Sequence, residues 1–402
     1  MKRAVLLLAA ASCFGQDWTQ WRGPTRDGVT TAQFPATWPK SLQLKWKVAV
    51  GEGLSSPVVV GDAAYVHSRA GADEAVTRID LATGKTVWRV TYAAPFEKNK
   101  YATGMAKGPF ATPMVFQGRV YTFGVTSILS CFDARDGKLI WRKDYSKESD
   151  TSNLFTGASV SPVLGLVWVV VHVGDDRGGS LIAHALDSGE ERWRSKGDGP
   201  GYATPIVRGL ISHPPYLVTL TDRSIVGVHA ATGRLVWTLP YKDNWNENIV
   251  SPVAFRERLI FSGVRKSTTS IRVNEDNWSV EPVWTNSDIS MYMSTPVVDG
   301  DYLYGLSSKK KGQFFCLDAR TGKTMWITEG REATQASFVA APNALLILTD
   351  TGDLIVAKKS PQKFEQISRY QVAESAVYSH LVPLNHRILV KDSNSLLLWQ
   401  VD

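Results

Sequence analysis

Cysteine is scarce in this 402-residue chain, which has three, at positions 13, 131 and 316. Three cysteines cannot supply the several disulfides on which small secreted scaffolds depend. The seven histidines show no His-x-x-x-His spacing and no pairing with cysteine that would indicate a metal site. The sequence also lacks a Gly-x-Ser-x-Gly nucleophile elbow and a phosphate-binding glycine loop. We therefore predict no catalytic and no metal-ligating residue.

Long apolar runs are missing as well. The runs at residues 4–11 and 162–173 are both too short to span a bilayer, so we predict no transmembrane segment. Lys2 and Arg3 precede the first run and small residues follow it, which is typical of a secretory signal. We predict a signal peptide at residues 1–15, with cleavage after Gly15 or Gln16, or lipid attachment at Cys13. An uncleaved apolar start is a further reading.

Positive charge is in moderate excess but is not concentrated. The formal net charge is +7, from 45 basic and 38 acidic residues, and the only notable basic cluster is Lys309–Lys311. A nucleic-acid-binding protein would gather its positive charge on one face. The sequence therefore predicts no nucleic-acid partner.

Internal repeats dominate the chain. Units begin with Ser or Thr followed by proline and a short apolar run, as in "SSPVVV" at 55, "ATPMVF" at 111 and "STPVVD" at 294. Further short β-type runs complete each unit at a period of roughly 42 to 53 residues, and four strands at about this period are typical of a β-propeller blade. Two degraded starts, at 336 and 379, bring the number of units to eight. We predict an all-β, eight-bladed propeller over residues 42–402, preceded by an N-terminal extension at 16–41.

Tryptophans mark the fourth strand of most units. We expect these side chains to anchor one blade against the next: Trp46, Trp88, Trp141, Trp193, Trp237, Trp284 and Trp326, with Tyr370 at the equivalent place in the seventh unit. The eighth unit ends after its third strand, so Trp46 in "LQLKWKV" at 42–48 supplies its fourth. This N-terminal strand would close the ring and remove its open edge. A seven-bladed alternative leaves this segment or the last unit unexplained.

The turn motif "LDARTGK" at 317–323 could be chemical or structural. Asp318 and Lys323 could form an acid–base pair, but Asp318 can equally accept hydrogen bonds from its own turn, where Gly322 supplies positive φ. In a propeller this turn lies opposite the loops that join successive blades, which favours a structural role. Cys131 and Cys316 precede this motif in units two and six, across the ring from one another, so we expect buried free thiols rather than a disulfide.

These repeats resemble the PQQ-like (pyrroloquinoline-quinone-type) propeller family. The family includes quinoprotein alcohol dehydrogenases and the propeller lipoprotein of the outer-membrane barrel assembly machinery, and the resemblance covers the chain from about Leu42 onward. The segment "WTQWRGPTRDGV" at 18–29 also resembles the start of exported PQQ-like repeat proteins, and we expect it to lie across the propeller surface.

The quinoprotein members imply a cofactor, pyrroloquinoline quinone with calcium, in the central funnel. Their pattern of an adjacent Cys-Cys pair, Glu and Asn ligands and an Asp base is incomplete here, because no Cys-Cys pair exists. The loop "DNWNEN" at 243–248 is the best remaining candidate for ligands. The resemblance thus leaves no confident cofactor site.

Aromatic side chains recur in the loops between blades. The candidate ligand-binding rim consists of Tyr101, Phe110, Phe155, Tyr202, Trp245 and Tyr292. Basic residues in neighbouring loops, among them Arg177, Arg223 and Lys309–Lys311, would favour an anionic partner. The alternative to a ligand-binding role is that the aromatic side chains pack against their own loops and the basic side chains are solvated.

Two functions remain open. The first is an exported, non-catalytic scaffold, expected to be a monomer of the periplasm or outer membrane, that binds a protein or polymer ligand of the cell envelope through its funnel face. The alternative is a divergent quinoprotein dehydrogenase.

Overall fold

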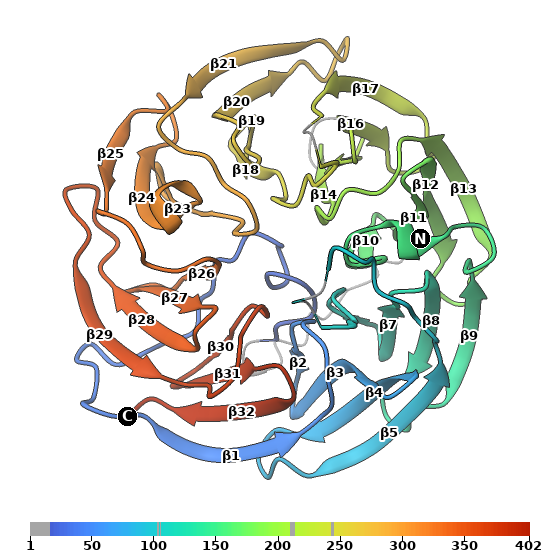
Figure 1. The fold of residues 1–402 in the computed structure, drawn as a ribbon, viewed down its shortest axis with the longest axis horizontal. Helices are drawn as coiled ribbons and strands as arrows, with labels where there is room; N and C mark the ends of the chain where they lie inside the picture. The colour runs from blue at the N-terminus through green and yellow to red at the C-terminus, as the bar shows by residue number, and fades with distance from the viewer. Residues whose placement is uncertain (1–16, 103, 105, 210–213, 243–244) are drawn as a thin grey trace, which may run out of the picture.

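The fold is a closed ring of eight four-stranded sheets, arranged like propeller blades (Figure 1). The computed structural model describes residues 17–102, 104, 106–209, 214–242 and 245–402. The predicted signal peptide and Cys13 lie outside these residues. Within the described residues, no helix is long and apolar enough to cross a membrane.

Neighbouring strands pair antiparallel within each blade, and the first strand lies nearest the ring axis (Figure 1). Blades one to four consist of β2 (Val58–Val60), β3 (Ala63–Ala70), β4 (Asp73–Asp80) and β5 (Thr86–Ala93); β6 (Met114–Phe116), β7 (Arg119–Phe123), β8 (Ile128–Asp133) and β9 (Leu139–Asp144); β10 (Val163–Gly165), β11 (Trp168–Asp175), β12 (Gly178–Ala185) and β13 (Glu191–Gly197); and β14 (Ile206–Arg208), β15 (Tyr216–Leu220), β16 (Ser224–His229) and β17 (Leu235–Pro240).

Blades five to seven repeat the pattern. They consist of β18 (Val253–Phe255), β19 (Arg258–Phe261), β20 (Thr268–Val273) and β21 (Val280–Asn286); β22 (Val297–Asp299), β23 (Tyr302–Ser307), β24 (Gln313–Asp318) and β25 (Thr324–Ile327); and β26 (Ala336–Ala340), β27 (Leu345–Thr349), β28 (Asp353–Ala357) and β29 (Gln366–Gln371). Two short 3₁₀ turns, η1 (Thr151–Asn153) and η2 (Lys309–Lys311), lie in connecting loops.

The eighth blade joins the two ends of the chain. β30 (Val382–Leu384), β31 (Arg387–Lys391) and β32 (Ser395–Gln400) come from the C-terminus, and β1 (Gln43–Ala49) pairs antiparallel with β32. The register places Trp46 opposite Leu398 and Val48 opposite Leu396. In Figure 1 the blue β1 lies on the outer side of the red β32. The predicted eight-bladed closure is confirmed, and the seven-bladed alternative is wrong.

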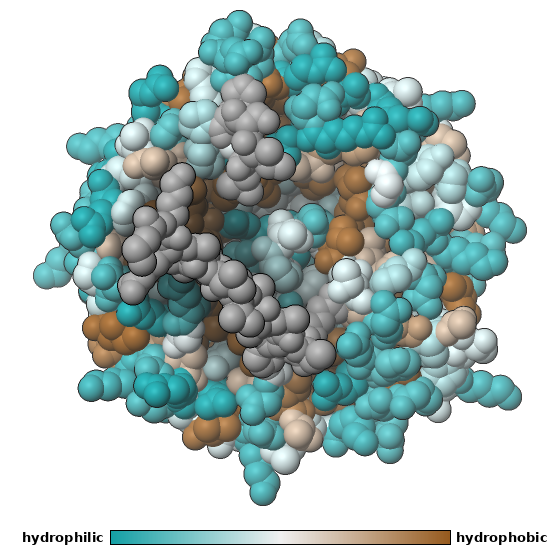
Figure 2. All heavy atoms as spheres, turned by 180° about the vertical axis from the view of Figure 1, so that it is seen from behind, coloured by the Kyte–Doolittle hydropathy of each residue, from teal (hydrophilic) through white to brown (hydrophobic). Residues whose placement is uncertain are grey.

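Burial explains why inner and outer strands differ in sequence. β8 belongs to a blade that is covered by another blade on each side, and the strand is buried almost throughout. Burial on both sides explains why most of its residues are apolar. β9 is the outermost strand of the same blade, and only Trp141 in it is buried. The periphery of the far side of the ring is mostly hydrophilic, and the surface is hollowed near the ring axis (Figure 2).

Each tryptophan on an outer strand contacts the next blade in the direction of the chain, and the contact is similar around most of the ring. The indole Nε1 of six of them donates to a backbone carbonyl of that neighbour: Trp46 to Leu81, Trp88 to Ala134, Trp141 to Leu186, Trp193 to Ala230, Trp284 to Ala319 and Trp326 to Ser360. Five of these rings also cover the turn glycine of that blade, as Trp88 covers Gly137. A Cβ on Gly137 would lie 2.7 Å from the Trp88 ring, so glycine is required for contact as well as for its φ of 76°.

Trp237 departs from this pattern. In the next blade Trp278, with φ 61°, takes the place of the turn glycine. Trp237 is still buried, but its Nε1 has no hydrogen-bond partner among the described residues. The missing glycine therefore coincides with the missing indole hydrogen bond.

The turn motif has structural partners. Asp318 accepts hydrogen bonds from the backbone N–H groups of Arg320 and Thr321 and from the Arg320 side chain. The Arg320 guanidinium holds the pKa of this carboxyl below its usual value. Cys131 and Cys316 are free and buried in blades two and six, and burial raises the pKa of each thiol to about 12. The thiols are therefore protonated and unreactive at neutral pH.

We predict that Gly137→Ala destabilises the ring more than Gly118→Ala does. Both glycines have positive φ, 76° and 71°, but nothing lies within 4 Å of a Cβ at Gly118. Backbone strain should cost each variant about 1–3 kcal/mol. The clash with Trp88 should cost Gly137→Ala roughly 1–3 kcal/mol more. Urea unfolding measures the free energy of unfolding of both variants. Equal losses in the two variants would contradict a stabilising role for the contact between Gly137 and Trp88.

Candidate funnel site

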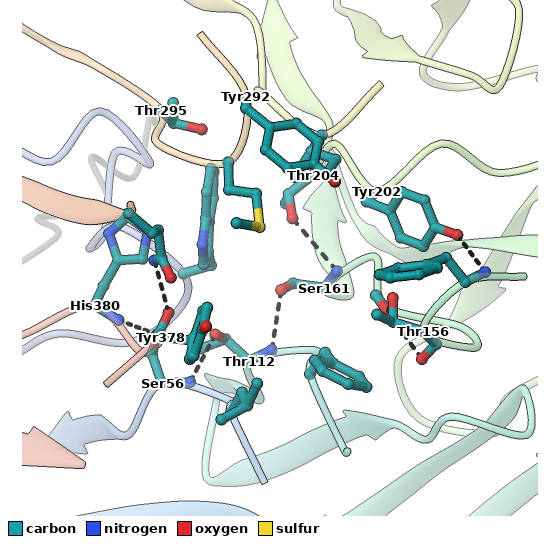
Figure 3. A pocket seen from close by; sticks show the side chains of 18 residues that line it. Ser56, Thr112, Thr156, Ser161, Tyr202, Thr204, Tyr292, Thr295, Tyr378 and His380 are labelled. Atoms are coloured by element: carbon teal, nitrogen blue, oxygen red, sulfur yellow. Dashed lines mark hydrogen bonds between the residues drawn. The ribbon is translucent and has the colours of Figure 1, made fainter. Parts of the chain in front are cut away.

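A cavity of about 320 Å³ lies at the ring axis, on the face that carries the loops between blades. We call this face the funnel face. The opposite face carries the hairpins that join the first strand to the second and the third to the fourth in each blade, and we call it the hairpin face. Aromatic and hydroxyl side chains dominate the lining (Figure 3): Trp21, Leu54, Ser56, Phe110, Thr112, Phe155, Thr156, Ser159, Ser161, Tyr202, Thr204, Ile249, Tyr292, Met293, Thr295, Gln335, Tyr378 and His380. None of these side chains is a carboxylate, a lysine or an arginine.

A girdle of hydroxyls joins the blades around this cavity. Its members are the Ser or Thr residues that precede proline in the repeats, and each oxygen accepts a backbone N–H from the preceding blade (Figure 3): His380 to Ser56, Ser56 to Thr112, Thr112 to Ser161, Ser161 to Thr204, Thr204 to Ser251 and Ser251 to Thr295. The Ser/Thr-Pro signature of the sequence thus has a structural cause. Among the described residues, none of the six hydroxyls donates to a protein acceptor, so their O–H hydrogens remain available.

The girdle is interrupted where the repeats are degraded. In blade seven the equivalent Ser337 hydroxyl is buried and has no partner among the described residues. Ala336 donates instead to Ser294, the residue before Thr295. In blade eight His380 takes the place of the hydroxyl residue.

The N-terminal extension supplies the floor of the cavity. Trp18 pairs with Val59 of β2 in blade one, and the Thr30 N–H donates to the Ala340 carbonyl at the end of β26 in blade seven. Between them Arg26 donates to the Leu164 carbonyl of blade three, so the segment crosses the ring. Within it, the Arg22 guanidinium donates to the carbonyls of Thr295 and Pro296 at 2.8 and 2.7 Å. Neighbouring Trp21 faces the cavity.

Burial controls the charge states below and beside the cavity. Desolvation lowers the pKa of fully buried Arg22 to about 10, against a weaker opposing effect of Asp27, so Arg22 remains cationic at neutral pH. Desolvation, with a smaller contribution from Arg22, lowers the pKa of His380 to about 3. His380 packs edge-on to Trp21, with ring centroids 5.4 Å apart, and is neutral at physiological pH. Because Arg22 points to carbonyls and His380 is neutral, the lining presents dipoles rather than charges.

The structure brings four of the six predicted rim residues together. Phe110, Phe155, Tyr202 and Tyr292 line the central cavity, and Tyr202 accepts the Phe155 N–H through its hydroxyl (Figure 3). Tyr101 and Trp245 lie farther out and are 74% and 65% exposed. They line a second cavity of about 480 Å³, of which Phe155 and Tyr202 also form part.

Sequence reasoning missed three cavity residues, Trp21, Tyr378 and His380. The "Trp-Arg-Gly-Pro" run at 21–24 was a visible signal, but it indicated contact with the propeller and not the depth of insertion. Tyr378 and His380 belong to the most degraded repeat, where the pattern is weakest.

At blades three and four, the basic side chains predicted to attract an anion are paired with aspartates. Arg177 pairs with Asp175, and Arg223 pairs with Asp222 at 2.8 Å. The Arg177 hydrogen bond lowers the pKa of Asp175 to about 2. These arginines are therefore neutralised by their own loops and exert little long-range attraction on an anion.

A pyrroloquinoline quinone with calcium does not fit this lining. The quinone carries three carboxylates and calcium prefers several oxygen ligands that include carboxylates, yet no charged side chain of the described residues lines the cavity. In the candidate loop, Glu247 accepts the Tyr292 hydroxyl at 2.6 Å, and the Asn248 amide donates to the carbonyls of Thr221 and Tyr241. Asp243 and Asn244 lie outside the described residues. Among those described, no group of three or more His, Cys, Asp or Glu could hold a metal.

The ring, its closure and its repeats define a PQQ-like eight-bladed β-propeller protein. Residues 72–328 match the family described as "Outer membrane protein assembly factor BamB", which is more than half of the chain. The chain belongs to this family.

Relatives by sequence and by structure agree on the architecture. The chain is 26% identical to the outer membrane protein assembly factor BamB of Burkholderia pseudomallei over 363 aligned residues, covering 77% of this chain and 86% of that one. The crystal structure of BamB from Moraxella catarrhalis is similar at a TM-score of 0.64, with 15% identity and coverage of 89% and 97%. A europium-containing methanol dehydrogenase reaches a TM-score of 0.72 at 11% identity, with coverage of 96% and 98%. At such identities the two structural likenesses establish the fold alone.

We predict that His380→Gln reduces the acid sensitivity of the protein. Because the pKa of His380 is about 3 when folded, against 6.5 ordinarily, only the unfolded chain takes up this proton as pH falls below about 6.5. Stability should therefore fall with decreasing pH, at up to roughly 1.4 kcal/mol per pH unit for this group. Urea unfolding between pH 7 and 4.5 measures the slope. An unchanged slope in the variant would contradict the assignment, since buried His172 contributes in the same direction in both proteins.

Proposed function

We propose that this protein is an exported, non-catalytic scaffold of the cell envelope that binds a protein or polymer ligand through its funnel face. Membership of the BamB family supports a role in outer-membrane protein assembly, because that is what the name of the family states. A monomer with the N-terminal segment removed at residues 15–16, or lipid-anchored at Cys13, acts in the periplasm or at the outer membrane.

The observation that carries this proposal is the chemistry of the central cavity. Its lining combines aromatic rings with hydroxyls, and among the described residues it has no charged group that could activate a nucleophile or bind a transferred proton. His380, the titratable residue nearest to such a role, is neutral, and its pKa of about 3 lies far from physiological pH. Such a lining suits recognition of an uncharged surface rather than reaction with it.

The quinoprotein alternative predicts saturable binding of quinone and calcium, and we expect none. Titration of the purified protein with pyrroloquinoline quinone and calcium chloride, followed by quinone absorbance and by dye-linked alcohol oxidation, should give no saturable signal. A quinoprotein alcohol dehydrogenase titrated in parallel is the positive control. Saturable binding with turnover would overturn the non-catalytic proposal.

A photo-crosslinking amino acid at Tyr101 should capture envelope proteins in cells, because this side chain is 74% exposed on the funnel face. The matched control is Val167, which is 52% exposed in the hairpin between β10 and β11 on the hairpin face. Adducts at Tyr101 that are absent at Val167 support the proposal.

Two outcomes would contradict it. Equal adducts at both positions would mean that the funnel face has no special binding role. Normal levels of β-barrel outer-membrane proteins in a strain lacking this chain would contradict the assembly role, while leaving the fold and the cavity as described.

A further inference from the structure

We propose that the central cavity and the adjoining outer cavity together bind a neutral glycan chain. This inference rests on the proposed binding role of the funnel face and names the class of ligand. The two cavities share Phe155 and Tyr202 in their linings, so they adjoin at these two side chains. The proposal joins them into one path from the ring axis to the rim between blades three and four.

Aromatic rings line both cavities. Trp21 and Phe110 lie at the axis, Phe155 and Tyr202 lie in the middle, and Trp245 lies at the rim. Trp245 is 65% exposed, so much of its ring faces the solvent at the rim. Flat aromatic faces match the apolar faces of sugar rings, and spacing along a path matches a chain of such rings better than a single compact ligand.

Unused hydrogen-bonding groups lie beside these rings at the axis. The girdle hydroxyls that line the cavity retain O–H donors, as described above. On the same lining, Gln335 Oε1 and His380 Nδ1 are buried and have no partner among the described residues. Buried polar atoms normally have partners, so these two atoms indicate a ligand or ordered water in the cavity.

The outer cavity has unused acceptors. Asn246 Oδ1 and Asp222 Oδ1 are both buried without a hydrogen-bond partner among the described residues. The other oxygen of Asp222 is paired with Arg223, and Glu247 accepts the Tyr292 hydroxyl. Asp176, Asp222 and Glu247 line this cavity, and no lysine or arginine among the described residues does, so the lining disfavours an acidic sugar.

A sugar hydroxyl fits this mixture better than a peptide group does. Each hydroxyl can accept from a girdle O–H and donate to an oxygen such as Gln335 Oε1 at the same time. A peptide N–H only donates and a peptide carbonyl only accepts, so a peptide would leave some of these neighbours unpaired. The absence of charged side chains around the central cavity further favours a neutral ligand.

The test uses isothermal titration calorimetry on the purified full chain with β-1,4-linked tetramers of glucose and of N-acetylglucosamine. We expect at least one tetramer to bind, and we expect Trp245→Ala and Phe110→Ala each to weaken binding at least about fivefold. Trp245→Phe should retain most of the affinity, because it keeps an aromatic face. Val167→Ala, on the hairpin face, should bind as the unmodified protein does.

Thermal melting of each variant separates loss of binding from loss of folding. Should Phe110→Ala unfold, Trp245→Ala decides, because the Trp245 side chain is 65% exposed and lies outside the buried core. The proposal is overturned if neither tetramer binds at millimolar concentration, if binding ignores both substitutions, or if neutral peptides bind at Trp245 in place of the sugars. Sugar binding without protein adducts in cells would support the glycan site and contradict the assembly role. Failure of the glycan proposal and failure of the assembly proposal can therefore be told apart.

Discussion

Closure of the ring by β1 and β32 is the interaction on which the other contacts depend. A blade has two flanks, and each flank is apolar because another blade covers it. If the pairing of Trp46 with Leu398 were absent, β32 would present an open edge and the last blade would lose its outer strand. The cost would extend to the next blade, because Trp46 of β1 donates to Leu81 and the His380 N–H donates to Ser56, and both contacts join blade eight to blade one. The two ends of the chain therefore stabilise every blade between them.

Two sets of contacts then hold neighbouring blades at fixed positions. At the rim, five indoles cover the turn glycine of the next blade, and at the axis, Ser and Thr hydroxyls accept backbone N–H groups across six of the junctions. Both sets use residues of the repeat, so the repeated residues have structural roles. The aromatic side chains that line the cavities come from the less regular loops between blades. The Trp237 junction shows that the ring tolerates one weaker contact.

The N-terminal extension changes the funnel from an open channel into a pocket with a floor. Arg22 is held by carbonyls of blade six, and Trp21 presents its ring to the space above. A buried guanidinium without a carboxylate partner costs desolvation energy, which its hydrogen bonds to carbonyls offset in part. The same cation helps to keep His380 neutral. One short segment thus forms the floor of the cavity and helps to keep its imidazole uncharged.

The sequence by itself determined the eight blades, the closing strand and the structural nature of the turn motif. These features come from local patterns that recur, so each copy supports the interpretation of the others. The rim aromatics were predictable as a set, but only the tertiary structure divided them between two cavities. It alone placed Trp21 and His380 together and paired Arg177 and Arg223 with aspartates. The physical reason is separation along the chain: Arg22 and Thr295 are 273 residues apart, and no local pattern encodes such a contact.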